Sequence, residues 1–160
     1  MRYRVERNIP FSPLIVWSVL RDLRHFADND PYHHDFRWLG ERREGAGAKF
    51  GLRHSYAPIY PFASDEVACT VTEWEPGEAQ TIVEANRRKY RSHTQRFTLT
   101  PLRFGSLVRF EVTLVGPPMW LLPWRLWVDF WALRRMRQKL ADIETACLKA
   151  YNAAITEELP

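Results

Sequence analysis

The sequence of 160 residues contains little of the material from which most metal and nucleotide sites are built. It has two cysteines, Cys69 and Cys147, and neither has a cysteine or histidine partner at the spacing of a zinc site. It also lacks a GxGxxG motif and a P-loop, and Gly45-Ala46-Gly47 has the composition of a turn. We therefore expect no metal and no cofactor, and we expect both cysteines to act as small buried hydrophobic residues.

Long apolar runs are also missing. The longest one, residues 119–133, is interrupted by Arg125 and Asp129 and falls short of the roughly 20 residues that span a bilayer. No secretory signal peptide is visible, because Met1 leads directly into a strand pattern. There is no internal repeat and no linker composition. We therefore expect a cytoplasmic protein that folds as a single domain over residues 1–160.

Aromatic and basic residues are plentiful. The chain is 46% hydrophobic and 14% aromatic, and large aromatic side chains fill wide cores and line apolar pockets. The formal net charge is +4, which suits an anionic partner without requiring one. Basic residues crowd one predicted hairpin at 87–91, but a nucleic-acid site would add stacking aromatics and a wider basic face. We interpret this run as a solvated loop and expect no nucleic acid as a partner.

Alternating apolar and polar residues predict a series of strands. These strands cover residues 3–9, 36–39, 49–56, 67–74, 81–86, 90–100 and 107–115. The breaks between them have turn composition and hairpin length, which favours an antiparallel meander. Two short helices are expected after the first strand. One begins at Ser12-Pro13, which suits a helix start, and the other covers residues 23–26.

The last third of the chain predicts one long amphipathic helix over residues 124–153. Its apolar arc holds Ala132, Leu133, Met136, Leu140, Ile143, Cys147, Ala150 and Tyr151. The opposite side holds Arg134, Arg135, Gln138, Lys139, Asp142, Thr145 and Lys149. This order of elements predicts an α+β fold, in which a curved antiparallel sheet of six or seven strands wraps around the C-terminal helix.

Several segments resemble the START-like superfamily, which includes polyketide cyclase/dehydrase-type (SRPBCC) and lipid-transfer proteins. They are the opening run from Val5 through Ser12-Pro13 to Phe26, the stretch from Gly47 to Leu52, the strand from Val71 to the acidic turn at Gly77, and the long closing helix. The resemblance implies a helix-grip fold with an apolar cavity under the last helix. It implies no particular catalytic residue, because no motif of a catalytic subfamily is present.

Strand parity predicts which side chains point inward, because successive residues of a strand face opposite sides. Mostly apolar walls with a few polar groups are typical of a small-molecule site, and a filled core is the alternative. The candidate ligand-binding residues are Phe50, Leu52, His54, Tyr56, Cys69, Val71, His93, Gln95, Phe97, Phe110, Val112, Trp127, Asp129, Phe130 and Trp131.

His93 and Asp129 are the candidate catalytic residues, because a histidine–carboxylate pair can act as a general acid and base. An inward histidine that is merely hydrogen-bonded is the alternative. Asp129 lies inside the apolar arc, so we expect His54, His93, Arg53 or ordered water beside it. The alternative is a carboxylate held by the positive end of the helix dipole.

His33, His34 and Asp35 look like metal ligands at first sight. Neighbours on an extended chain point in opposite directions, and the turn residues around these three suggest solvent. We therefore expect no metal site there.

Tryptophans and leucines crowd the start of the last helix. They are Trp120, Leu121, Leu122, Trp124, Trp127 and Trp131. A buried cavity lid is one interpretation, and a contact with a membrane surface is the other.

Three functions are consistent with these features. The leading one is binding or transport of a hydrophobic small molecule, such as a lipid, a quinone or a polyketide-like compound. The second is a cyclase/dehydratase-type enzyme that uses an inward histidine and Asp129. The third is a peripheral membrane or partner-interaction module that acts through the tryptophan-rich segment.

Overall fold

The structure, a computed structural model, describes residues 1–28, 30, 32–55, 64–86, 92–115 and 122–157. The strands are β1 Arg2–Ile9, β2 His33–Trp38, β3 Lys49–Ser55, β4 Ser64–Glu75, β5 Ala79–Asn86, β6 Ser92–Leu102 and β7 Gly105–Val115. The helices are α1 Pro13–Leu20, α2 Leu23–Asp28 and α3 Leu122–Glu157. The predicted elements are therefore present, and α3 is a few residues longer at each end than the pattern indicates.

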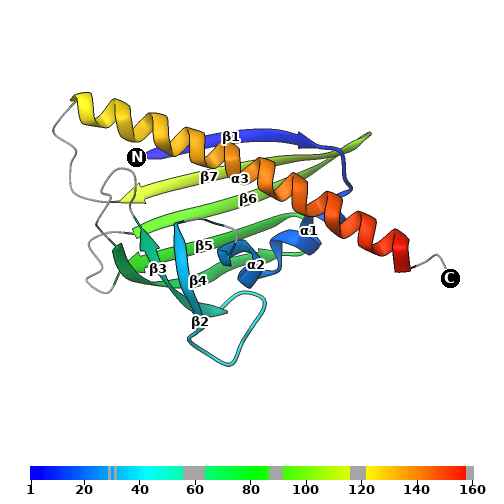
Figure 1. The fold of residues 1–160 in the computed structure, drawn as a ribbon, viewed down its shortest axis with the longest axis horizontal. Coiled ribbons are helices and arrows are strands. Elements are labelled where there is room, and N and C mark those ends of the chain that lie inside the picture. The colour runs from blue at the N-terminus through cyan, green and yellow to red at the C-terminus, as the bar shows by residue number, and fades with distance from the viewer. Residues whose placement is uncertain (29, 31, 56–63, 87–91, 116–121, 158–160) are drawn as a thin grey trace.

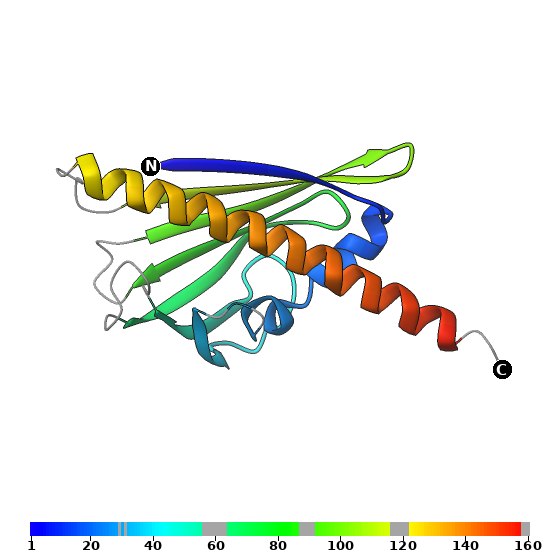
Figure 2. The ribbon, with the colours of Figure 1, turned by 45° about the horizontal axis from the view of Figure 1, so that its top comes forward.

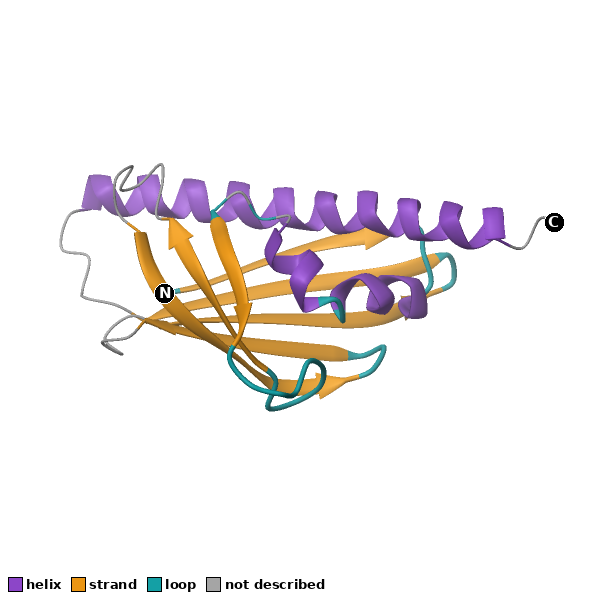
Figure 3. Ribbon diagram, turned by 60° about the horizontal axis from the view of Figure 1, so that its bottom comes forward, coloured by secondary structure: helices purple, strands orange, loops and turns teal. Residues whose placement is uncertain are grey.

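The seven strands form one antiparallel sheet in the order β1-β7-β6-β5-β4-β3-β2. Strands β2 to β7 follow one another as a meander, and β1 pairs with β7 at the far edge. Helix α3 runs along one face of the curved sheet, and α1 and α2 lie on the same side (Figures 1 and 3). The predicted α+β helix-grip architecture is confirmed.

Local chemistry explains two of the turns. Ser12 has the extended backbone of an N-cap, and its carbonyl accepts the Val16 amide at 3.1 Å. Gly105 follows the β6–β7 turn with φ +107°, and a Cβ there would lie 2.2 Å from the carbonyl oxygen of Ile9. Only glycine fits this close approach of β1 to the hairpin.

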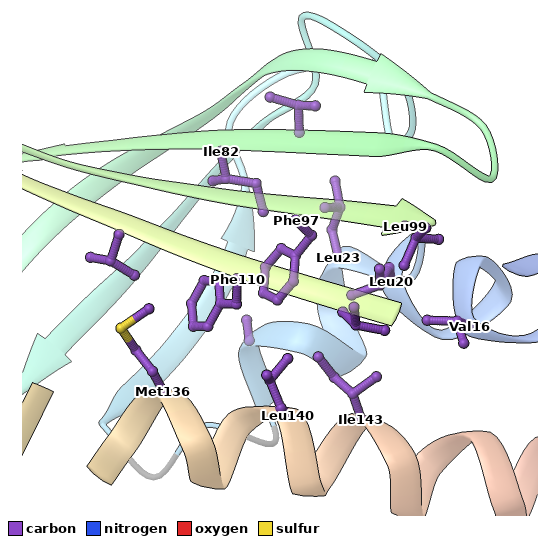
Figure 4. Packing of buried hydrophobic residues seen from close by; sticks show 14 of the residues in the cluster. Val16, Leu20, Leu23, Ile82, Phe97, Leu99, Phe110, Met136, Leu140 and Ile143 are labelled. Atoms are coloured by element: carbon purple, nitrogen blue, oxygen red, sulfur yellow. The ribbon is translucent and has the colours of Figure 1, made fainter. Parts of the chain in front are cut away.

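The apolar core lies between the inner face of the sheet and α3. Phe97 and Phe110 stack with ring centroids 4.2 Å apart, and Leu140 and Ile143 of α3 point toward them (Figure 4). The helices α1 and α2 add Val16, Leu20 and Leu23 to the cluster. Most apolar residues that strand parity places inward are buried, among them Phe50, Leu52, Cys69, Val71, Phe97, Phe110 and Val112, whereas Leu114 is only partly buried.

Both cysteines are free and buried, as predicted. Burial raises the pKa of the Cys147 thiol to about 11 and holds that of Cys69 well above its ordinary value. Neither thiol is therefore a ready nucleophile at neutral pH.

Helix α3 is long, but its polar residues recur throughout. Across the described ranges, no helix combines the length and the hydrophobicity that crossing a membrane requires.

Candidate functional site

A buried carboxylate, Glu84, lies on the inner face of β5, the middle strand of the sheet, near the end of that strand. It shares this face with Ile82, two residues earlier on β5, and it stands opposite Cys69 on β4 and His93 on β6. The Glu84 side chain is only 5% exposed. A carboxylate at such a position is tolerated only with strong hydrogen-bond donors around it.

Two histidines supply donors to Glu84. The Nδ1 atom of His54 lies 2.5 Å from Glu84 Oε1, and the Nδ1 atom of His93 lies 3.3 Å from the same oxygen. The rings of the two histidines are 5.7 Å apart and meet edge to face. One carboxylate oxygen of Glu84 is thus shared by two imidazoles that come from different strands.

The outer nitrogens of these histidines fix which tautomer is present. Arg135 Nη1 lies 3.4 Å from His54 Nε2, and Gln95 Nε2 lies 2.7 Å from His93 Nε2. Guanidinium and amide nitrogens only donate, so each imidazole must accept at Nε2 and carry its proton at Nδ1. Each histidine therefore faces Glu84 with a nitrogen that can donate to its carboxylate.

The charge state of Glu84 follows from a balance of two effects. Burial by itself would raise the pKa of its carboxyl. His93 and His54 together outweigh burial and hold that pKa well below its ordinary value. Glu84 is therefore an ionised, acceptor-only group at neutral pH.

His33 completes this arrangement from β2. Its side chain is 2% exposed, and its ring lies edge to face against that of His54 at 5.0 Å. Its Nδ1 is 3.8 Å from Asp30 and its Nε2 is 4.0 Å from Glu84 Oε2, distances too long for hydrogen bonds. Among the residues that the structure describes, both His33 nitrogens and Glu84 Oε2 have no hydrogen-bond partner.

Asp30 ties this region to α3. Arg135 Nη2 lies 2.8 Å from its Oδ1, Lys139 Nζ lies 3.2 Å from its Oδ2, and the Tyr32 amide donates to Oδ1 at 3.1 Å. Burial would raise the Asp30 pKa, but Lys139, His33 and Arg135 outweigh it and lower that pKa. We refer to Asp30, His33, His54, Glu84 and His93 as the polar cluster.

A metal ion is one group to test against the polar cluster. His33, His54 and Glu84 each offer a ligand atom, and these atoms lie within 4.8 Å of one another. Two imidazoles and a carboxylate are common ligands of transition metals. However, Arg135 favours a proton on the His54 nitrogen that faces Glu84, and Arg135 and Lys139 both add positive charge nearby. The donor set therefore suits a neutral hydrogen-bonding group better than a cation.

Sequence reasoning placed part of this site correctly. It turned His54, His93 and Gln95 inward, and the structure brings them together. It missed Glu84, although the alternation with Ile82 on β5 could have found it. It placed His33 in solvent, which is wrong, because β2 begins at His33 and pairs it with His54. His34 and Asp35 are exposed, as expected.

Two cations of α3 are also misplaced by the helical pattern. The pattern predicts that Arg135 and Lys139 face solvent, but the Lys139 side chain is only 11% exposed. The cause is Asp30, a loop residue that no periodicity identifies and that pairs with both cations.

Asp129 has a hydrogen-bond donor beside it, as expected, but the donor is none of the three side chains named for it. The hydroxyl of Tyr3 donates to Asp129 Oδ1 at 2.6 Å, and Arg125 lies 3.8 Å from its other oxygen. Arg53 pairs instead with Asp35 at 3.2 Å. The Asp129 side chain is 33% exposed and lies beside the edge strand β1. The expected partner His93 is on β6, two strands further along the sheet.

The start of α3 carries an exposed aromatic face. Leu126, Trp127 and Phe130 are exposed, so the interpretation as a buried lid is wrong for Trp127. Trp131 is partly buried and packs edge to face on Trp127 at 5.5 Å. The remaining residues of interest lie outside the described residues or have undescribed side chains: Tyr56, 87–91, Trp120, Leu121, Leu122 and Trp124.

Comparison with known proteins gives a family and a set of similar folds. The family described as polyketide cyclase / dehydrase and lipid transport matches residues 1–147. No curated protein sequence matches this chain. The protein TTHA0849 from Thermus thermophilus is 16% identical, with a TM-score of 0.73 over 94% of this chain and 99% of that chain.

Two further solved structures have the same fold. Ara h 8.0201 is 12% identical, with a TM-score of 0.66 over 93% of this chain and 98% of its own. The di-domain ARO/CYC StfQ from the steffimycin biosynthetic pathway is 12% identical, with a TM-score of 0.74 over 94% of this chain and 51% of its own. At these identities the likeness establishes the fold.

Proposed function

The chain belongs to the polyketide cyclase/dehydrase and lipid transport family, and on that basis we propose that it binds a hydrophobic small molecule between the inner face of the sheet and α3. One observation carries the proposal. The inner face is apolar along most of its length, yet it holds Glu84 and His33, whose buried polar atoms have no partner among the described residues. An apolar wall with a few convergent polar groups is the usual composition of a small-molecule site.

The apolar part of such a site would lie beside the first half of α3. Ala132 and Leu133 of α3 and Leu114 of β7 are only partly buried, although they pack against the core. Apolar side chains that the protein itself leaves incompletely covered favour an apolar guest. Each 100 Å² of apolar ligand surface removed from water contributes about 2.5 kcal/mol before the costs of binding.

A neutral apolar fluorophore, N-phenyl-1-naphthylamine, tests this proposal. The variant Leu133→Trp adds bulk where α3 faces the core, and Leu148→Trp makes the same change at an exposed position of the same helix. We expect the wild type and Leu148→Trp to bind the probe and Leu133→Trp to bind it at least tenfold more weakly. Equal probe binding by a folded Leu133→Trp variant would place the ligand elsewhere.

The nature of the cargo needs a separate measurement. Lipids, quinones and polyketide-like compounds all fit an apolar site with one polar end. Native mass spectrometry of the freshly purified protein would reveal a co-purifying molecule by its added mass. The absence of both probe binding and a co-purifying mass in the wild type would count against a ligand-binding role.

A second candidate function is a cyclase/dehydratase-type enzyme, which is favoured by the pairing of Glu84 with two imidazoles. A carboxylate that orients histidines is a common general acid–base arrangement. Asp129 contributes less to this candidate than the sequence indicates, because its recorded partners are Tyr3 and Arg125. Loss of substrate turnover in His93→Ala, with binding of N-phenyl-1-naphthylamine unchanged, would support the enzymatic function. Unchanged turnover in this variant would argue against it.

A further inference from the structure

Within the part of the chain that the structure describes, Glu84 and His33 keep buried polar atoms without a hydrogen-bond partner, and these atoms define a specific chemical requirement. Glu84 Oε2 and His33 Nε2 are 4.0 Å apart, and both are buried on the inner side of the sheet. The other Glu84 oxygen is already taken by His54 and His93. An unpaired buried polar atom is costly, so a group that pairs with both atoms at once would stabilise the site.

We propose that Glu84 and His33 form a subsite for a neutral hydroxyl group of the bound molecule, so that the ligand is an apolar alcohol or phenol. This inference rests on the proposed ligand-binding function and specifies the polar end of the ligand. The hydroxyl would donate its proton to Glu84 Oε2 and accept the N–H of His33 at Nε2.

The 4.0 Å separation of the two atoms matches one oxygen atom that bridges them. An oxygen about 2.8 Å from each of two atoms that lie 4.0 Å apart subtends an angle of roughly 90° between them, which two hydrogen bonds tolerate. His33 is a neutral donor, because burial holds the pKa of its imidazole well below its ordinary value, despite the opposing effect of Asp30. A neutral imidazole carries one proton, and in the proposed arrangement it is the Nε2 proton of His33 that the hydroxyl oxygen accepts.

Other polar groups fit the same place less well. A carbonyl only accepts hydrogen bonds and would leave Glu84 Oε2 unpaired. A carboxylate would be repelled by the ionised Glu84. An ammonium group would satisfy Glu84 but could not accept from His33, and it would bring a third cation close to Arg135 and Lys139. A hydroxyl both donates and accepts and carries no charge, so it meets every condition.

The subsite is continuous with the apolar wall. Glu84 is flanked on the inner face by Ile82 on its own strand and by Cys69 on β4, both of which are buried. A ligand whose hydroxyl meets Glu84 would therefore place its carbon skeleton against these side chains.

A pair of matched compounds tests the assignment. 1-Naphthol and 1-methylnaphthalene have nearly the same shape, and they differ in a hydroxyl or a methyl group at one position. Each would be titrated as a competitor of N-phenyl-1-naphthylamine on the full chain. We expect the wild type to prefer 1-naphthol by at least tenfold, since a buried polar site rejects an analogue that lacks the hydroxyl.

Two variants of the subsite should remove this preference. Glu84→Gln keeps the shape but leaves a single acceptor oxygen, which His54 and His93 already require, so the ratio should fall to about one. His33→Phe keeps a buried ring without nitrogens and should lower the ratio several-fold; it also serves as a second variant if Glu84→Gln does not fold. Glu66→Gln, which neutralises an exposed glutamate on β4, should keep the wild-type ratio.

The possible outcomes separate this inference from the function on which it rests. Equal binding of the two naphthalenes by the wild type, or a ratio unchanged in both folded subsite variants, would overturn the hydroxyl assignment and leave the apolar site intact. Failure of the probe and both compounds to bind would overturn the ligand-binding proposal as well. Stoichiometric zinc or iron in the purified protein would identify the polar cluster as a metal site and also overturn the assignment.

Discussion

Phe97 and Glu84 lie on neighbouring strands of the same inner face, and both are almost fully buried, yet different forces hold them. Phe97 is stacked on Phe110 inside a continuous apolar cluster, where contacts are many and non-directional. Glu84 depends on two individual histidine contacts and keeps one oxygen without a partner among the described residues. The apolar region is thus held by many small contacts, whereas the polar cluster depends on a few specific ones between charged and polar groups.

The largest expected effect concerns the buried ion pair of the polar cluster. Asp30→Ala leaves Lys139 buried without its carboxylate, so we expect the free energy of unfolding to fall by about 3–5 kcal/mol in urea denaturation. The double variant Asp30→Leu/Lys139→Met should recover most of that loss, because an apolar pair needs no partner. No recovery would mean that Asp30 acts through its other contacts.

A cavity in the apolar region should lower the free energy of unfolding slightly less than the loss of Asp30 does. Leu140→Ala removes a side chain that is 1% exposed against the Phe97–Phe110 pair, and a loss of about 3 kcal/mol is typical of such a change. Leu148→Ala, on the exposed side of α3, is the matched control and should cost less than about 1 kcal/mol. Similar losses in the two variants would show that the α3 contacts do not hold the core as described.

The pH dependence of stability should separate the two regions again. Burial keeps His33 neutral in the folded protein, whereas the unfolded chain binds a proton below its ordinary pKa of 6.5. The contribution of His33 is therefore complete above pH 6.5 and is lost as the pH falls toward the lower pKa of the folded state. The carboxyls of Asp30 and Glu84 also contribute less to the free energy of unfolding as the pH falls. Their unfolded pKa values of 3.8 and 4.5 place this loss at lower pH.

Comparison with His33→Phe isolates this contribution. Between about pH 7 and pH 5 the wild type should lose about 1–2 kcal/mol more of its unfolding free energy than the variant, since one unit of pKa shift corresponds to about 1.4 kcal/mol. Parallel curves for the two proteins would show that His33 is protonated in the folded state as well.

The smallest effect is expected at the partly exposed carboxylate. Tyr3→Phe removes the hydrogen bond to Asp129, which water and Arg125 can replace because the side chain is 33% exposed. We expect a loss of about 1 kcal/mol or less in unfolding free energy, and unchanged binding of N-phenyl-1-naphthylamine. A clear loss of probe binding with the fold intact would restore Asp129 as a ligand-contacting residue.

Short-range periodicity was enough to predict most of the architecture. The alternation of Phe50, Leu52 and His54 on β3, and of Gln95, Phe97 and Leu99 on β6, identifies one inner face of the sheet. The same parity rule turns His54 and His93 inward, and on β5 it would have turned Glu84 inward beside Ile82. Glu84 was therefore predictable, but the parity rule was not applied to β5.

Other residues of the site could not have been found in this way. Asp30 lies in the loop between α2 and β2, where no period exists, and its partners Arg135 and Lys139 look like ordinary solvent-facing cations on a helical projection. His33 belongs to the site only because the register of β2 and β3 pairs it with His54. Tyr3 meets Asp129 across 126 positions of sequence.

The amino-acid sequence by itself therefore determined the elements, their order and the apolar faces that they bury, because these depend on residues a few positions apart. The tertiary structure alone decided which polar groups meet inside. Hydrogen bonds and ion pairs act over about 3–4 Å between particular atoms, and those distances are set by strand register and by the way α3 crosses the sheet (Figure 2).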